Sequence, residues 1–261
     1  MDIQHKVAIV TGAGGNGSGR AIACRLAREG AMVVVSDINE AGGSETVTRI
    51  ESAGGRAAYY VTDMRVEAQV RGLIGFAEKT FGGLSVLVNN ASAAPHPGEA
   101  LGNWVDSVQT DLLGTIYATR FAVDAMRRAG GGAIVNVSSI SALWHGRKSP
   151  GGFPAYDAAK AGIIRFTTGL ASLGETDRIR VNCLAPGWIG SDEVRGYWES
   201  LTPEQRLERG APSKLLQPED VAEAVVRLAT DESLRGRILV WWSEDPPRLI
   251  PWADPGYAAL V

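Results

Sequence analysis

The chain has 261 residues, of which 45% are hydrophobic and 21% charged, the composition of an ordinary soluble globular protein. A net charge of −3 gives no basic footprint for nucleic acid, and the longest apolar runs, such as Met32 to Val35, are too short to span a bilayer. Cys24 and Cys183 both fall inside expected secondary-structure elements, so we expect reduced core cysteines and a cytoplasmic protein without a signal peptide.

Short apolar segments alternate with helical segments along the chain. Strands are expected at 7–10, 32–36, 56–61, 85–88, 133–137, 180–184 and 238–242, and helices at 17–29, 40–53, 66–81, 100–129, 155–175 and 218–229. This alternation indicates crossover connections and a parallel sheet, hence an α/β fold in one domain over residues 1–261. Two segments interrupt it. The strand-free stretch 186–217 has the length of a functional lid or a disordered loop, and we expect a substrate lid over 188–214. The proline-rich tail at 244–261 is expected to be irregular, with aromatic side chains that pack on another surface.

A glycine-rich segment joins the first strand to the first helix, with the sequence Thr11-Gly12-Ala13-Gly14-Gly15-Asn16-Gly17-Ser18-Gly19. Glycines let the backbone turn tightly and approach a pyrophosphate, whose charge the N-terminus of the helix stabilises. A plain turn can have the same composition, but the position between a strand and a helix favours a dinucleotide site.

Asp37, at the end of the second strand, indicates which dinucleotide is bound. A carboxylate there accepts hydrogen bonds from the adenosine ribose and repels a 2′-phosphate. Because no basic residue stands at Asn16, Ile38 or Asn39, we expect NAD rather than NADP.

The chemistry is indicated by Ser139, Tyr156 and Lys160. Tyr156 and Lys160 are four residues apart in an alanine-rich segment that favours a helix, so the phenol and the ammonium share one face. A free phenol titrates near ~10, and a neighbouring cation lowers that pKa, so such a pair can exchange a proton with a substrate oxygen. Ser139 follows the strand at 133–137, at the edge where open α/β sheets bind ligands.

Five motifs in this order resemble the short-chain dehydrogenase/reductase family from Lys6 to about Leu239. They are the glycine loop, Asp63, Asn89-Asn90-Ala91, Ser139 with Tyr156 and Lys160, and Pro186-Gly187. The resemblance implies a Rossmann-type doubly wound fold with a mostly parallel seven-stranded sheet, a nicotinamide cofactor, and hydride transfer to or from an alcohol or ketone. It also implies that Tyr156 is the general acid/base, that Ser139 holds the substrate oxygen, and that Lys160 lowers the tyrosine pKa and binds the nicotinamide ribose.

The resemblance further implies a set of cofactor contacts. Asp63 matches the adenine contact, Asn89 and Ala91 match backbone positions along the cofactor, and Ile189 and Ser191 match the carboxamide contacts, with Ser191 where threonine is usual. The whole expected set is Gly12, Asn16, Gly17, Ser18, Gly19, Asp37, Ile38, Asp63, Met64, Asn89, Ala91, Tyr156, Lys160, Pro186, Gly187, Ile189 and Ser191.

Four departures from the family pattern stand out. One extra residue precedes Gly17 in the glycine loop, Ser92 replaces the usual glycine after Ala91, and the ending becomes Val240-Trp241-Trp242-Ser243. Asp111 stands where the family has a catalytic-relay asparagine. An aspartate can still accept that residue's hydrogen bond, but its charge near the lysine would oppose the shift of the tyrosine pKa. Asp111 is therefore either a working catalytic substitute or a sign of weakened catalysis.

Substrate is expected to reach Tyr156 between the loops at 92–98 and 140–154 and the lid at 188–214. The candidate contacts are ring-bearing side chains, which suggest an apolar or ring-containing substrate: His96, Trp144, His145, Phe153, Trp188 and Trp198. Any one of them taken alone is better explained as a packing residue than as a determinant of specificity; only the set as a whole suggests the substrate. The histidines lack the spacing and carboxylate neighbours of a metal site, so no metal is expected.

Three functions are compatible with these patterns. The first is an NAD-dependent alcohol dehydrogenase or ketone reductase. The second is a cofactor-binding sensor or scaffold that has lost turnover, and a serine hydrolase is disfavoured because Ser139 lacks the G-x-S-x-G elbow. The intact Ser139, Tyr156 and Lys160 favour the enzyme. The resemblance implies a homotetramer or homodimer, and the expected partner is a small alcohol or ketone, with neither nucleic acid nor membrane.

Overall fold

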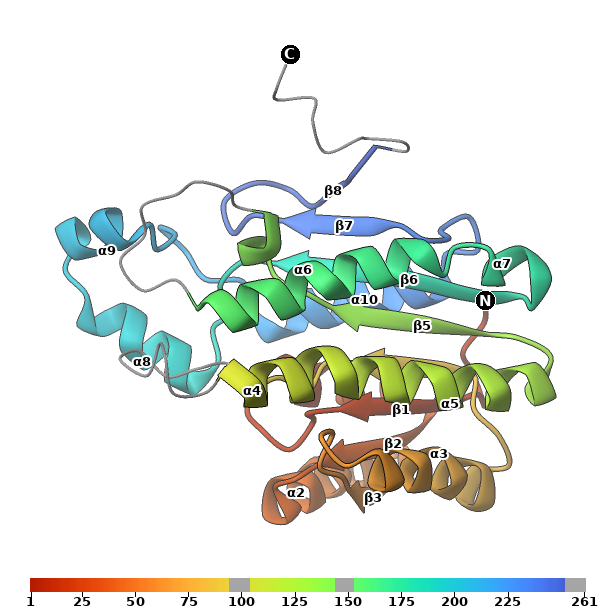
Figure 1. The fold of residues 1–261 in the computed structure, drawn as a ribbon. Coiled ribbons are helices and arrows are strands. Elements are labelled where there is room, and N and C mark those ends of the chain that lie inside the picture. Colours follow the sequence, from red (N-terminus) through yellow and green to blue (C-terminus); the bar gives the residue numbers. More distant parts are fainter. Residues whose placement is uncertain (94–103, 144–152, 252–261) are drawn as a thin grey trace.

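A computed structural model of the chain describes residues 1–93, 104–143 and 153–251 (Figure 1). Within these residues the strands form one eight-stranded sheet of order β3-β2-β1-β4-β5-β6-β7-β8. The strands are β1 Val7–Thr11, β2 Met32–Asp37, β3 Arg56–Val61, β4 Val86–Asn89, β5 Gly132–Val137, β6 Ile179–Pro186, β7 Ile238–Trp241 and β8 Arg248–Leu249. Each neighbouring pair from β3 to β7 is parallel, so the predicted α/β Rossmann-type fold is confirmed.

The expected number of seven strands was wrong by one, and the tail at 244–261 is not irregular throughout. β8 lies inside that tail and pairs antiparallel with β7, with Leu239 opposite Leu249. Leu249 packs on the core formed by β1, α1 and α10, which explains why this short strand forms. Two paired residues in a proline-rich segment carry no hydrophobic periodicity, so the sequence pattern could not reveal them.

Two layers of helices cover the sheet. The helical elements are α1 Ser18–Arg28, α2 Glu40–Ser52, α3 Glu67–Phe81, α4 Trp104–Ser107, the π-helical turn η1 Val108–Leu113, α5 Gly114–Ala129, the 3₁₀ turn η2 Ile140–Leu143, α6 Pro154–Gly169, α7 Leu173–Thr176, α8 Asp192–Ser200, α9 Pro203–Arg209 and α10 Pro218–Thr230. α1, α2 and α10 lie on one face, and α3, α5 and α6 lie on the other (Figure 1).

The core follows from the period of two along the central strands. In β1, Ala8 and Val10 join the cluster beneath α1 and α10, whereas Val7 and Ile9 join the cluster beneath α3 and α5. Every residue of β1 is buried, as expected for a parallel strand covered on both faces. Burial of a side chain as large as that of Ile9 contributes roughly 1.5–3 kcal/mol. This packing fixes the strand ends, from which the site is built.

The helix expected at 100–129 is not continuous in its described part. α4 passes into the turn η1 and then into α5. Interruptions of this kind inside α-helices frequently occur at functional sites. The turn contains Asp111, whose side chain is fully buried. The helix expected at 155–175 is likewise shorter, because α6 ends at Gly169 and α7 follows separately.

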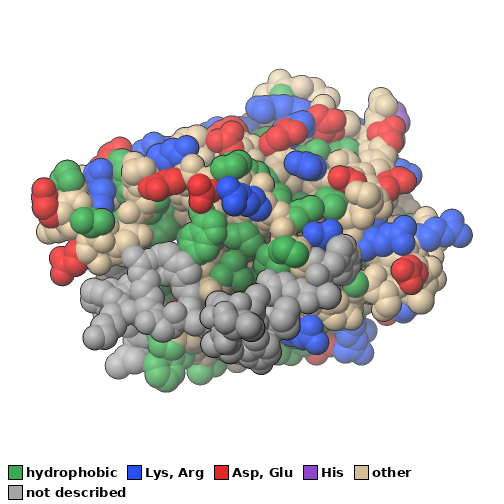
Figure 2. Space-filling model, turned by 90° about the horizontal axis from the view of Figure 1, so that it is seen from above, with side chains coloured by type: hydrophobic (Ala, Val, Ile, Leu, Met, Phe, Trp, Pro, Cys, Tyr) green, Lys and Arg blue, Asp and Glu red, His purple; other side chains and the backbone are tan. Residues whose placement is uncertain are grey.

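α8 and α9 stand at the end of the sheet toward which the parallel strands point (Figure 1). They lie within 188–214, the segment for which a lid was predicted; it contains no strand of the sheet, and its Ile189 forms an isolated bridge with Leu216. Charged side chains of both signs are mixed over the face seen in Figure 2, with hydrophobic side chains grouped near its middle. No helix within the described parts of the chain is long and apolar enough to cross a membrane.

Candidate active site

The glycine loop begins where β1 ends and β4 lies beside it. Gly12 has φ +66, and a Cβ on it would lie 2.7 Å from Ala91 Cα, so a side chain cannot be accommodated there. Asn90 Nδ2 donates to Thr11 O across 3.0 Å, and Ser18 Oγ donates to Asn90 Oδ1 across 2.8 Å. Asn90, which the expected set of cofactor contacts omitted, therefore joins the loop and the start of α1 to the end of β4.

Asp37 closes the other side of the loop. Its Oδ2 accepts a hydrogen bond from the Gly14 N–H across 2.7 Å, and its Oδ1 accepts one from the Asn39 N–H across 2.9 Å. Each carboxylate oxygen can accept a second hydrogen bond, so the ribose contact expected from the sequence remains available. Ile38 is 62% exposed beside it.

Arg20 holds the part of the glycine loop that contains the extra residue before Gly17. The sequence analysis did not identify this arginine. Arg20 is 7% exposed and donates to Thr46 Oγ1 (2.9 Å), Gly14 O (3.0 Å), Gly42 O (3.2 Å), Glu45 Oε2 (3.0 Å) and Asn16 Oδ1. These acceptors come from the loop and from α2, so the guanidinium fixes one to the other. The sequence signal that could have identified it is its position directly after Gly19, the last glycine of the loop.

Asn16 links the loop to the lid. Its Nδ2 donates to Asp192 Oδ2 across 3.0 Å, at the first residue of α8. Ser191 caps the same helix by accepting from the Val194 N–H across 3.4 Å, and it lies close to Gly17. The lid therefore begins directly against the glycine loop, a contact between residues 176 positions apart in sequence.

Ser139, Tyr156 and Lys160 meet at the carboxyl end of β5. Pro154 occupies the first turn of α6, where its missing N–H costs nothing, so Tyr156 stands near the helix start and Lys160 one turn later. Lys160 Nζ lies 5.3 Å from the centre of the Tyr156 ring, and the Ser139 hydroxyl is hydrogen-bonded to the Tyr156 hydroxyl. The predicted helical spacing thus brings the expected groups together.

Lys160 is held by three further contacts. Its Nζ donates to Val137 O across 3.2 Å and lies 3.1 Å from Asp111 Oδ2. Its backbone carbonyl accepts from Ser138 Oγ across 2.7 Å. Because the Lys160 side chain is only 3% exposed, these contacts decide where its charge lies.

The balance of charges around Tyr156 differs from the sequence expectation. Burial raises the pKa of Tyr156, Lys160 lowers it, Asp111 raises it and the Ser139 hydroxyl lowers it, and the result is a pKa above that of a free phenol. Burial also acts to lower the pKa of Lys160, but Asp111 and Tyr156 outweigh it and raise that pKa. Lys160 thus acts in the predicted direction, while burial and the Asp111 charge oppose it.

Three further residues of the expected cofactor set, Asp63, Met64 and Asn89, lie at or just after the ends of β3 and β4. Asp63 accepts from Arg65 Nη2 across 2.8 Å, which lowers the pKa of the Asp63 carboxyl. Met64 is buried against Gly114. The Asn89 side chain is buried and donates to Thr119 Oγ1 and to Asn136 Oδ1 of the next strand, so its amide braces the sheet rather than facing the edge.

The residues after β6 lead into the lid. Pro186 ends the strand opposite Trp241, and the Gly187 N–H donates to Trp241 O across 2.8 Å. Ile189 O accepts from the Ser191 N–H across 2.9 Å. The altered ending at Trp241 therefore supports the segment that carries the expected carboxamide contacts.

The expected substrate contacts divide into two groups. His96, Trp144 and His145 lie outside the described residues. Trp188 stacks on Tyr197 of α8 at 6.1 Å between ring centres, and Phe153 precedes α6 immediately. Trp198 packs against the Arg206 guanidinium at 3.6 Å and donates to Pro212 O, so it holds the lid together. In the described parts of the chain no cluster of His, Cys, Asp and Glu could hold a metal ion.

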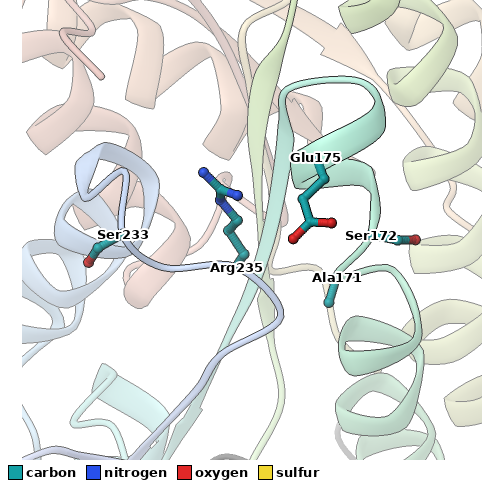
Figure 3. Close-up of a pocket in the computed structure, with 5 residues that line it drawn as sticks. All are labelled: Ala171, Ser172, Glu175, Ser233 and Arg235. Carbon is teal, nitrogen blue, oxygen red and sulfur yellow. The ribbon is translucent and has the colours of Figure 1, made fainter.

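A separate surface cavity of about 460 Å³ lies at the opposite end of α6, between α7 and the segment before β7 (Figure 3). It is lined by Ala171, Ser172, Glu175, Ser233 and Arg235. None of the predicted site residues lines it, because they gather at the other edge of the sheet.

Comparison with known proteins identifies the family to which the chain belongs. The sequence profile of the short chain dehydrogenase family matches residues 6–201. A cis-4-hydroxycyclohexanecarboxylate dehydrogenase of Sinomonas cyclohexanicum is 37% identical, with 87% of this chain and 90% of that one covered. A cyclohexanol dehydrogenase of Acinetobacter sp. (strain SE19) is 32% identical over 88% and 90%. A short-chain type dehydrogenase/reductase from Mycobacterium ulcerans superposes with a TM-score of 0.82 at 26% identity, over 92% and 89%. The chain belongs to the short-chain dehydrogenase/reductase family of oxidoreductases, whose members use nicotinamide cofactors.

The edge of the sheet fits such a cofactor. Among the described residues, a Cβ built on Gly15 meets nothing within 4 Å, and one on Gly17 meets only Ser191 Cβ, at 3.6 Å. The loop is therefore open on the side where a diphosphate would approach the start of α1. Asp37 and Lys160 stand on either side of it, as ligands for the two riboses would require.

Proposed function

We propose that this protein transfers a hydride between NAD(H) and the carbon of a secondary alcohol or ketone, with Tyr156 as general acid/base. The observation that carries the proposal is the meeting of Tyr156, Lys160 and Ser139 at the sheet edge that also holds the glycine loop. A phenol beside a buried ammonium at that position is suited to moving a proton on a substrate oxygen.

The residues of the chain position the reactants and handle the proton. When bound, the nicotinamide supplies the hydride chemistry. Ser139, already bonded to the phenol, would hold the substrate oxygen next to Tyr156. Tyr156 donates its proton to that oxygen in reduction and accepts one in oxidation, while Lys160 lowers the cost of the phenolate. Asp63, Asn89, Ala91 and Ile189 remain proposed cofactor contacts.

NAD is preferred over NADP in this proposal because Asp37 stands beside the glycine loop. Its carboxylate is fixed by the Gly14 and Asn39 amides and would repel a 2′-phosphate. The kcat/KM measured with NAD should exceed that with NADP by at least about tenfold, and Asp37→Asn should narrow the ratio. A clear preference of the native protein for NADP would contradict the assignment.

The substrate class we propose is a cyclic secondary alcohol or its ketone. Two relatives act by name on cyclohexane rings, and the described substrate side of this chain offers Phe153 and Trp188 to an apolar ring. A panel of cyclic and linear alcohols, followed by NADH absorbance, tests this. Consistently better kcat/KM for linear alcohols would argue against a ring-shaped substrate.

The direct test of the mechanism is Tyr156→Phe. It should lower kcat/KM at least about 100-fold, because general acid/base catalysis contributes on that scale, while NADH binding measured by fluorescence stays unchanged. Tyr60→Phe removes the hydroxyl of a partly exposed tyrosine in β3 and serves as the matched control with full activity. Full activity of Tyr156→Phe would refute the proposal.

A cofactor-binding sensor is the second candidate, favoured by the Asp111–Lys160 pair, which opposes formation of the phenolate. It requires tight NAD binding with no turnover across the whole alcohol and ketone panel at any pH. We also propose a homotetramer or homodimer, which light scattering of the purified protein can test, and a cytoplasmic location, which fractionation of the cells can test.

A further inference from the structure

Ser92 and Asp111, two of the residues at which the chain departs from the family pattern, contact each other. The Ser92 hydroxyl donates to Asp111 Oδ2 across 2.7 Å, and the Ala93 N–H donates to Asp111 Oδ1 across 2.8 Å. Asp111 is fully buried in η1, whereas Ser92 is an exposed residue of the loop after β4. Two donors from one loop therefore fix the direction of a buried carboxylate.

The carboxylate held in this way faces Lys160. The Lys160 Nζ and Asp111 Oδ2 atoms are 3.1 Å apart, and the two side chains are only 3% and 0% exposed. A buried ion pair repays its desolvation only when further hydrogen bonds satisfy the remaining lone pairs and protons. The Ser92 and Ala93 donors supply those bonds on the carboxylate side.

We propose that Ser92 and Asp111 form one positioning unit for Lys160, in which the Ser92 hydroxyl and the Ala93 N–H hold the Asp111 carboxylate against the ammonium that assists Tyr156. The proposal rests on the function given above, in which Tyr156 exchanges the substrate proton. Its consequence is that Lys160 acts on the phenol together with a fixed negative charge. Proton donation to a ketone is then favoured near neutral pH, and alcohol oxidation at alkaline pH.

The titratable groups that face Tyr156 and Lys160 come from three elements. Burial has the largest effect and raises the pKa of Tyr156; Lys160 of α6 lowers it, and Asp111 of η1 and Asp157 of α6 raise it. Cys183 of β6 faces Lys160, and burial raises the pKa of its thiol to about 12, so it stays neutral in an ordinary assay. Removal of the Asp111 charge is therefore the change that most directly alters the pKa values of Tyr156 and Lys160.

Asp111→Asn is the first test, with cyclohexanol and NAD as substrates. Oxidation requires the phenolate, so kcat/KM rises with pH through the pKa of Tyr156. Removing a nearby negative charge lowers that pKa, and we expect the rise to move about one pH unit toward acid. At a pH below both midpoints the variant should then exceed the native protein by about tenfold. An unmoved profile, or one moved toward alkali, overturns the proposal.

Ser92→Ala decides whether the two residues act as one unit. It should move the profile toward acid in the native background and have a clearly smaller effect when Asp111→Asn is already present. Ser107→Ala is the matched control, because Ser107 Oγ donates to Ala93 O across 3.1 Å in the same loop without contacting Asp111. It should leave the profile in place. Equal shifts by Ser92→Ala in both backgrounds would contradict the coupling.

A readout without turnover separates this inference from the proposed function. The tyrosinate absorbance of the native protein minus that of Tyr156→Phe, followed over pH, reports Tyr156 directly. Its midpoint should fall in Asp111→Asn even if no substrate is ever oxidised. Absence of turnover with a lowered midpoint would refute the function and support the positioning unit, whereas an unchanged midpoint would refute the unit.

Discussion

Arg20 beneath the glycine loop and Lys160 beneath Tyr156 are both buried cations at the ligand-binding edge of the sheet, but their surroundings differ. The Arg20 guanidinium is shared among five acceptors, and its carboxylate partner Glu45 is 50% exposed. The Lys160 ammonium meets one carboxylate, that of Asp111, which is fully buried. The first arrangement fixes a backbone, while the second sets the charge felt by a reacting group.

The two buried cations therefore belong to different parts of one proposed site, Arg20 to the part that would bind the cofactor and Lys160 to the part that would carry out the chemistry. The glycine loop, the proposed nucleotide site, is held by geometry, because most acceptors of Arg20 are neutral oxygens whose positions matter more than their charge. The proposed catalytic side is held by charge, because Lys160 and Asp111 alter the pKa of Tyr156, and Asp111 and Tyr156 alter the pKa of Lys160. Changes on the first side should affect stability and cofactor binding, and changes on the second should affect rate and its pH dependence.

The largest expected effect on stability is that of Arg20→Leu. It leaves the carbonyls of Gly14 and Gly42 without their buried donor and Glu45 without its cation. Losses of this kind cost about 3–5 kcal/mol in unfolding free energy, measured by urea denaturation, and NAD binding should weaken in parallel. Arg25→Leu of the same helix, whose ion pairs with Glu29 and Glu223 are partly exposed, should cost less than about 1 kcal/mol. Equal losses of unfolding free energy in the two variants would show that the contacts of Arg20 do not fix the loop more strongly than an ordinary surface ion pair does.

Lys160→Met should be nearly as destabilising, by about 3 kcal/mol, because it leaves the Asp111 carboxylate buried without its cation. Replacing both partners, with Lys160→Met and Asp111→Leu together, should recover most of the stability but none of the activity. Urea denaturation and turnover of the same preparations give both readouts. A double variant no more stable than Lys160→Met would show that the pair is not what holds this region.

Gly42→Ala should cost about 1–3 kcal/mol, because its Cβ would lie 2.0 Å from Gly14 O and push α2 away from the loop. Because the glycine loop is the proposed binding site for NAD, the KM for NAD should rise in this variant while kcat changes little. Gly75→Ala in α3 has open space around its Cβ within the described residues and should stabilise by about 0.5–1 kcal/mol. A fall of kcat with unchanged KM in Gly42→Ala would mean that the loop also serves the chemistry.

The smallest effect is expected for Arg65→Gln. The hydrogen bonds from Arg65 lower the pKa of Asp63 in the folded protein, so their contribution is present above the unfolded pKa and lost as pH falls through the folded one. The variant should lose less than about 1 kcal/mol at pH 7, because the Arg65 side chain is 40% exposed, and the loss should shrink as the pH falls through the folded pKa of Asp63. Arg71→Gln removes another exposed ion pair without contacting Asp63, so its loss should not track the titration of Asp63.

The sequence by itself determined the alternation of strands and helices, the glycine loop before α1, and the pairing of Tyr156 with Lys160. Hydrophobic period, glycine chemistry and helical spacing are local, and the structure follows them closely from β1 to β7. Family membership was likewise readable, because its motifs are short segments in a fixed order.

Only the tertiary structure decided how Arg20, Asn16 and Asp192 join the loop to the lid, and how Ser92 meets Asp111. The contacts between Asn16 and Asp192 and between Ser92 and Asp111 link residues 176 and 19 positions apart, and no periodicity relates such residues across elements. The effect of Asp111 on the tyrosine was also a question of distance and burial, which depend on the π-helical turn that places its carboxylate inside the protein. Local patterns fix which groups a segment carries, but the electrostatic environment of a group depends on which distant segments pack against it.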